Sequence, residues 1–197
     1  MTHDDLHTLR EGWDFEAKLA AGRDGRGAVP SSLWETYAAM ANTFGGRILL
    51  GARELPDGML QPVGIPDIDK VETDFWNQLN DRSKVSVNLL TRAMVTRVEF
   101  DGLTLLQIDV PKADRAHLPV HLNGSFQHNT FVRIADGDRR ADPDTVRRLV
   151  ADSDPLRDSR ILPEYTIDDL DPATLRHFRE VFLARRRGHP FAAVDGI

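Results

Sequence analysis

The segment over residues 31–53 constrains the fold more than any other part of the chain. Its first half repeats apolar residues at helical spacing after a serine cap at Ser31 or Ser32, and Gly45-Gly46 ends the helix. Residues 47–53 are typical of a buried strand. A helix that turns directly into a buried strand predicts a layer of helices against a sheet. The residues of this helix expected to face inward are Leu33, Tyr37, Met40, Ala41 and Phe44.

Periodicity, turns and caps predict the remaining elements in the same way. Residues 13–19 alternate apolar with polar side chains, which predicts a half-buried strand with Trp13, Phe15, Ala17 and Leu19 facing inward. The other expected elements are a short strand at 61–63, a helix over 68–79 capped by Asp67, a hairpin of 94–100 with 103–110, a strand over 130–134 and a helix capped by Asp142.

This order of elements predicts an α+β fold with a mixed, largely antiparallel sheet and about three packed helices. We expect one domain over residues 1–153. Residues 154–197 are interpreted as a linker and a helical arm, with a helix that begins at Asp171-Pro172. The apolar end of the sequence favours a parent chain that continues past Ile197 into a further module.

Composition excludes several classes of protein. The chain has no cysteine, which rules out disulfides, thiolate zinc sites and cysteine nucleophiles and favours a reducing, cytoplasmic setting. Its apolar runs are too short to span a bilayer, so we expect no membrane partner. A formal net charge of -6 means that binding to a polyanion requires a local basic surface. The glycine-rich loop over 22–27 lacks the Gly-Lys-Ser/Thr ending of a P-loop, so no visible motif supports ATP binding.

Glu16-Ala17-Lys18 has the Glu-x-Lys form found in many metal-dependent nucleases. Two residues apart on a strand, the carboxylate and the ammonium project from one face and can meet at one phosphate. An exposed strand face is the alternative explanation. A restriction-endonuclease-like fold could also use this triplet, but it requires a metal-binding aspartate on a preceding strand, and Asp4 and Asp5 lie in no strand pattern.

A longer pattern surrounds the triplet. Glu11 lies five residues before Glu16, and Ala41-Asn42-Thr43-Phe44-Gly45-Gly46 leads through Ile48-Leu49-Leu50-Gly51 to Glu54. These motifs resemble the Schlafen-type, AlbA-like nucleic-acid-binding domain. Val132-Arg133-Ile134 and the helix after Asp142 are similar to the closing strand and last helix of that domain. The resemblance covers about residues 9–150, and the sequence from Ser159 is similar to the connector of bacterial relatives described as divergent ATP-binding proteins or transcriptional regulators.

The resemblance implies a three-carboxylate endoribonuclease site that acts on structured RNA such as tRNA. Carried over by position, the metal ligands and catalytic carboxylates are Glu11, Glu16 and Glu54, with Lys18 at the scissile phosphate. Hard oxygen ligands of this kind suit Mg²⁺ or Mn²⁺. Glu11 and Glu16 are separated by an odd number of residues, so their convergence requires a bulge near Gly12. The family usually has an aromatic residue at the position of Ala17 and often an aspartate at that of Glu54.

Nucleic acid is the expected partner, RNA more than DNA. The candidate phosphate-binding residues are Arg133, Arg139, Arg140, Arg147, Arg148, Lys112 and Arg115, with solvated arginines among aspartates as the alternative. Asn42, Gly45 and Gly46 are best explained as a helix stop.

Two other functions stay open. One is a non-catalytic, DNA-directed regulatory module of a larger protein, and the other is a scaffold in which two single lobes pair as a homodimer.

Overall fold

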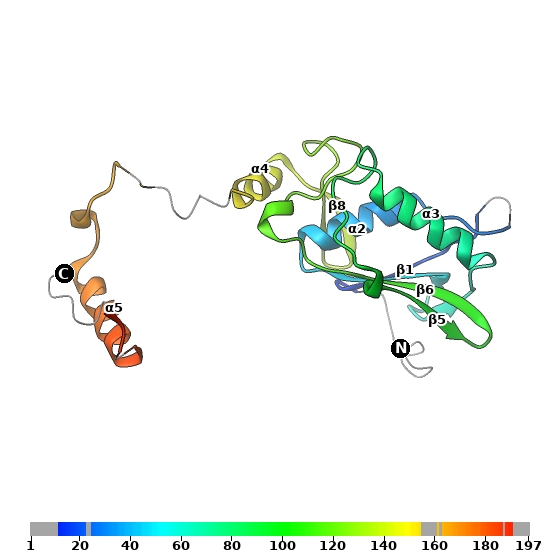
Figure 1. Ribbon diagram of the computed structural model, residues 1–197, viewed down its shortest axis with the longest axis horizontal. Coiled ribbons are helices and arrows are strands. Elements are labelled where there is room, and N and C mark those ends of the chain that lie inside the picture. Colours follow the sequence, from blue (N-terminus) through cyan, green and yellow to red (C-terminus); the bar gives the residue numbers. More distant parts are fainter. Residues whose placement is uncertain (1–11, 23–24, 155–160, 162, 187, 191–197) are drawn as a thin grey trace. The chain divides into compact units, whose positions relative to one another are not determined.

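The computed structural model describes residues 12–22, 25–154, 161, 163–186 and 188–190 (Figure 1). It divides into two compact units, Met1–Arg157 and Asp158–Ile197. The first unit is built on a four-stranded sheet with the order β1-β2-β6-β5. Its strands are β1 (Phe15–Lys18), β2 (Gly46–Leu50), β6 (Leu103–Val110) and β5 (Val95–Phe100). β1 pairs with β2 in parallel and the other pairs are antiparallel, so the predicted α+β class with a mixed, largely antiparallel sheet is confirmed.

Three α-helices lie in the described part of this unit: α2 (Ser32–Asn42), α3 (Ile68–Asn80) and α4 (Pro143–Asp152). The predicted caps of α3 and α4 are present, because the side chains of Asp67 and Asp142 accept hydrogen bonds from backbone N–H groups in the first turns. α2 has no side-chain cap hydrogen bond at Ser31. Nine of its 11 residues are buried, so packing rather than capping stabilises this central helix.

The main hydrophobic core lies between α2, α3 and one face of the sheet, which contributes Ile48 and Leu50 from β2. The opposite face carries a second, smaller cluster that includes Phe15, Ala17 and Leu49. Alternate residues of β2 therefore enter two different cores. This double burial explains the uninterrupted apolar run in the sequence of β2.

Three apolar residues that we expected to face inward are exposed. The exposed fractions are 57% for Trp13, 40% for Leu19 and 70% for Phe44. Each lies just outside a regular element, because β1 spans only Phe15–Lys18 and α2 ends at Asn42. The period-two and helical patterns continue in the sequence for one or two residues beyond these elements, and for that reason the three side chains were expected to be buried.

The single strand predicted over 47–53 is two strands. Gly51, with φ +93°, separates β2 from β3 (Ala52–Glu54), and β3 pairs with β4 (Leu60–Pro62) instead of joining the main sheet. The carbonyl of Gly51 accepts hydrogen bonds from the backbone N–H groups of Val63 and Gly64. A Cβ at this position would lie 2.9 Å from the Leu105 side chain, so the turn requires glycine.

A second hairpin pairs β7 (Phe131–Ile134) with β8 (Gly137–Arg140). The sequence predicted β7 but not β8, whose residues Gly-Asp-Arg-Arg have little strand propensity. Short 3-10 helices lie at η1 (Arg92–Met94) and η2 (Arg115–His117).

The second unit contains η4 (Ile167–Asp169) and α5 (Pro172–Arg185). The predicted cap is present, since the Asp171 carboxylate accepts a hydrogen bond from the backbone N–H of Thr174 at 2.7 Å. No residue of α5 is buried. Among the described residues of the chain, no helix combines the length and the apolar character that crossing a bilayer requires.

Candidate functional site

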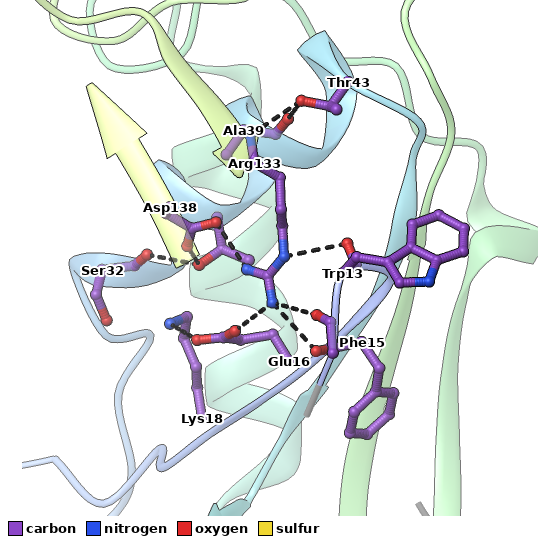
Figure 2. A network of polar contacts seen from close by, with 11 residues as sticks. Trp13, Phe15, Glu16, Lys18, Ser32, Ala39, Thr43, Arg133 and Asp138 are labelled. Carbon is purple, nitrogen blue, oxygen red and sulfur yellow. Dashed lines mark hydrogen bonds and ion pairs between the residues drawn. The ribbon is translucent and has the colours of Figure 1, made fainter. Parts of the chain in front are cut away.

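Glu16 lies at the centre of a buried ionic network on β1. Its Oε1 accepts a hydrogen bond from Lys18 Nζ at 2.9 Å, and its Oε2 accepts one from Arg133 Nη2 at 2.8 Å (Figure 2). The side chains are only 15% exposed for Glu16, 12% for Lys18 and 2% for Arg133. Both oxygens of the Glu16 carboxylate are therefore engaged by cations of the protein itself.

Arg133 is the hub of the network. Its Nε donates to the Trp13 carbonyl at 3.1 Å, and its Nη2 also donates to the carbonyls of Gly12 at 2.6 Å and Phe15 at 3.2 Å. Its Nη1 donates to Asp138 Oδ1 at 2.7 Å. Burial alone lowers the pKa of Arg133, but the hydrogen bonds and charges of Glu16 and Asp138 outweigh that effect and raise it. The guanidinium of Arg133 is enclosed and its donors are used within the fold, which favours a structural role over the phosphate contact expected from the sequence.

The network joins three segments that are distant in sequence. Asp138 on β8 accepts a hydrogen bond from the Thr36 hydroxyl on α2. At the end of α2, Thr43 Oγ1 accepts from the backbone N–H of Arg133 at 3.0 Å and donates to the Ala39 carbonyl at 2.8 Å (Figure 2). Arg133 thus fixes the start of β1, the end of α2 and the β7–β8 hairpin relative to one another.

The described residues do not fit the metal site that the resemblance implies. Glu16 projects from the face of β1 opposite to Phe15 and Ala17. Glu54 is exposed and lies directly across from Leu60, which belongs to the same cluster as Phe15 and Ala17. Glu16 and Glu54 therefore project to different faces. The part of the chain that the structure describes contains no group of three or more His, Cys, Asp or Glu side chains able to hold a metal ion. The third predicted ligand, Glu11, lies outside the described residues.

The other candidate phosphate-binding residues are exposed. Arg139 and Arg140 lie on β8, and the Arg140 guanidinium is 5.8 Å from the centre of the Phe131 ring. Arg147 and Arg148 lie on α4, where Arg147 forms an ion pair with Asp144. Six aspartates accompany the five arginines between residues 131 and 154, so this surface has no excess of positive charge. The last two candidates, Lys112 and Arg115, are exposed in the segment after β6.

Asn42 has a larger structural role than a helix stop. Its Nδ2 donates to the carbonyls of Val120 at 2.7 Å and Phe131 at 2.9 Å, and its Oδ1 accepts from the Val120 N–H at 2.8 Å. The two glycines that follow are required by space. A Cβ on Gly45, which has φ +79°, would lie 2.7 Å from the Val110 carbonyl oxygen, and one on Gly46 would lie 2.8 Å from the Met40 sulfur.

Sequence reasoning missed an aromatic pair on the surface beside this turn. The rings of Trp13 and Phe44 meet edge to face, with their centres 6.0 Å apart. Lys112 Nζ lies 5.6 Å from the centre of the Phe44 ring. Both aromatics lie one or two residues outside a regular element, where an apolar residue in the sequence gives no sign that it is exposed.

Comparison with known proteins places most of the chain in one family. The model of the Schlafen AlbA_2 domain matches residues 11–142, and the model of a domain of unknown function (DUF8451) matches residues 147–196. No curated protein matches the sequence.

The solved structures similar to the chain include the following two. The N-terminal domain of a putative ATP-dependent DNA helicase RecG-related protein from Nitrosomonas europaea is 31% identical, with a TM-score of 0.50, and the match covers 71% of this chain and 90% of that one. The DIP2311 protein from Corynebacterium diphtheriae is 22% identical, with a TM-score of 0.49, over 93% of this chain and 31% of that one. The family model covers well over half of the sequence and carries Glu16, the Asn-Thr-Phe-Gly-Gly turn and Arg133, and the chain therefore belongs to the Schlafen AlbA_2 family.

Proposed function

We propose that this chain binds nucleic acid as a non-catalytic module of the Schlafen AlbA_2 family. The non-catalytic part of this proposal rests on one observation. Lys18 and Arg133 engage both oxygens of the Glu16 carboxylate. A metal ion at Glu16 would share the carboxylate with two cations that already contact both of its oxygens, and a third positive charge there is disfavoured. The contacts of Glu16 therefore support a structural role for the Glu-x-Lys triplet.

The exposed cations on the proposed phosphate-binding surface are Lys112, Arg115, Arg139, Arg140, Arg147 and Arg148. With a net charge of -6 and aspartates interleaved among the arginines, we expect moderate affinity with a strong dependence on salt. The family resemblance favours RNA, whereas the similar domain from Nitrosomonas europaea belongs to a protein named for a DNA helicase. Both nucleic acids therefore enter the test.

Fluorescence anisotropy with labelled RNA hairpins, duplex DNA and single-stranded DNA tests the proposal. Each arginine that contacts a phosphate is expected to lower the affinity several-fold when changed to glutamine, and to reduce the slope of log K against log salt by about 1. Arg148→Gln and Arg139→Gln are the test variants. Arg53→Gln on β3, an exposed arginine bonded to Gln61, is the matched control and should bind like the wild type.

Cleavage of RNA by Glu11, Glu16 and Glu54 with Mg²⁺ or Mn²⁺ is the competing function. We expect purified protein to leave labelled tRNA intact with either ion. Glu54→Gln is the informative variant, because Glu54 is exposed and lies outside the Arg133 network. Manganese-stimulated cleavage that disappears in Glu54→Gln, with folding unchanged, would contradict the proposed non-catalytic role.

A further inference from the structure

Trp13 and Phe44 form an exposed aromatic surface. Single exposed apolar residues are common, whereas two large exposed rings in contact with one another form a contiguous apolar patch of the kind that marks a binding site. A pocket of about 420 Å³ adjoins them. It is lined by both rings, the Gly45-Gly46 backbone, Asp14, and the ion pair between Arg47 and Asp109, whose atoms Nε and Oδ1 are 2.7 Å apart. We call the two rings together with Lys112 the aromatic platform.

The backbone under the platform is rigidly held. The carbonyl of Trp13 and those of its neighbours Gly12 and Phe15 all accept hydrogen bonds from Arg133, while the indole of Trp13 points away from the guanidinium (Figure 2). On the other side, Phe44 lies between Thr43, which is bonded to the Arg133 N–H, and Gly45, whose N–H donates to the Met40 carbonyl at 2.8 Å. One buried arginine therefore fixes both segments that carry the rings. A platform fixed in this way loses little conformational entropy when a ligand stacks on it.

The chemistry around the rings selects the kind of partner. The cores of protein–protein interfaces are depleted of charged residues, yet this pocket is lined by the Arg47–Asp109 pair and Asp14, and the Lys112 ammonium lies 5.6 Å from the centre of the Phe44 ring. Aromatic rings next to a cation are the combination that binds a base by stacking and its phosphate by charge. The ammonium of Lys112 can pair with the phosphate, and the carboxylate of Asp14 in the pocket lining can accept hydrogen bonds from the donor groups on the edge of a base.

We propose that the aromatic platform stacks an unpaired base of a single-stranded or looped nucleic acid, with Lys112 at the neighbouring phosphate. This inference rests on the proposed nucleic-acid-binding function and specifies the form of its ligand. A base in a continuous duplex presents only its edges, so its face is not accessible to Phe44 or Trp13. The protein is therefore expected to prefer a single strand over the duplex of the same sequence.

Anisotropy titrations with one labelled oligonucleotide, alone and annealed to its complement, test the platform in the full chain. Phe44→Leu is expected to weaken single-strand binding roughly five- to a hundred-fold and duplex binding little, because base stacking is lost. Phe44→Trp should restore the affinity. Met59→Ala removes another exposed apolar side chain, 47% exposed in the β3–β4 turn, and should bind like the wild type. A circular dichroism melt of each variant checks that the fold is retained.

Tryptophan fluorescence gives a second readout. Trp13 is 57% exposed, whereas Trp34 is 2% exposed and Trp76 is half-buried, so a stacked base should quench mainly Trp13. Trp13→Phe should abolish the quenching and keep most of the affinity, since phenylalanine can still stack.

Three results would overturn the platform. Equal single-strand affinity in Phe44→Leu and wild type, with duplex bound as well as single strand, would refute it and leave nucleic-acid binding intact. Loss of a dimer in Phe44→Leu by light scattering, with single-strand binding unchanged, would identify the surface as a contact between two copies of the chain instead. The absence of binding to every RNA and DNA by the wild type would remove both proposals together.

Discussion

Replacing Arg133 by methionine is the most direct test of the buried network. Methionine keeps much of the aliphatic volume but removes the guanidinium, so Glu16 and Asp138 become buried carboxylates that lack their main cation. The backbone carbonyls of Gly12, Trp13 and Phe15 lose a donor as well. The network thus loses both charge compensation and hydrogen bonds in one substitution.

The magnitude follows from burial. The side chain of Arg133 is 2% exposed and those of both acidic partners are 15% exposed, so water replaces the lost contacts poorly. Removing one partner of a buried ion pair typically costs about 3–5 kcal/mol. We expect a loss of about 4 kcal/mol in the free energy of unfolding, a large share of the ~5–15 kcal/mol that stabilises an ordinary domain.

Urea titration followed by tryptophan fluorescence measures this loss. All three tryptophans, Trp13, Trp34 and Trp76, lie in the first unit, so the signal reports that unit alone. Arg139→Met, at an exposed position on β8, is the matched control and should change stability by less than about 0.5 kcal/mol.

A double-mutant cycle separates the ion pair from general damage. Glu16→Gln is expected to destabilise the wild type by about 1–2 kcal/mol and to cost less in the Arg133→Met background, because the carboxylate keeps only Lys18 as a cation there. If Arg133→Met does not fold, Arg133→Lys takes its place, since lysine keeps the charge and loses the forked geometry. A loss in Arg133→Met no larger than that of Arg139→Met would refute the structural role of the network.

Three further predictions concern the core. Asn42→Ala leaves three backbone groups of other segments without a partner, and chemical denaturation should show a loss of about 3 kcal/mol, whereas a loss below about 1 kcal/mol would contradict the contacts. Gly45→Ala should destabilise the protein more than Gly102→Ala. The two glycines have almost the same φ, +79° and +78°, but a Cβ has room only at Gly102. Equal losses in thermal melts would mean that backbone conformation alone decides the cost. Burial raises the pKa of Tyr37 to about 12, so the stability that the neutral phenol contributes is complete below pH 10 and is lost as the pH rises toward 12. In a Tyr165→Phe chain, where Tyr37 is the remaining tyrosine, the absorbance of the phenolate should rise near pH 12. A rise near pH 10 would contradict the burial of Tyr37.

The sequence was sufficient for the elements that follow simple local rules. Alternation, turns and caps depend on residues that are adjacent in sequence. They were therefore enough to predict the β5–β6 hairpin, the Asp67 and Asp142 caps and the α+β class. β8 and the break at Gly51 could not be predicted from the same rules. β8 consists of polar residues that depend on pairing with β7, and the break depends on side chains that pack around Gly51 from distant segments.

The site was predicted as a set of residues but not as an arrangement. Glu16, Lys18 and Arg133 were all singled out, and the structure brings them together as partners of one another rather than as groups that face a ligand. Local sequence shows that a residue is charged, whereas its counter-ion is decided by tertiary contacts. Phe44 illustrates the opposite error, because an apolar residue next to a buried helix was expected to be buried as well.

The contact between Arg133 and Glu16 also bears on how the chain is made, because 117 positions separate the two residues. A ribosome releases β1 long before the β7–β8 hairpin, and contacts at such separation form slowly. While synthesis proceeds, Glu16 and the start of β1 have no arginine to hold them. β1 can pair with β2 early, but its anchoring through Arg133 comes late, and any nascent chain that ends before residue 138 lacks the Asp138 that completes the network.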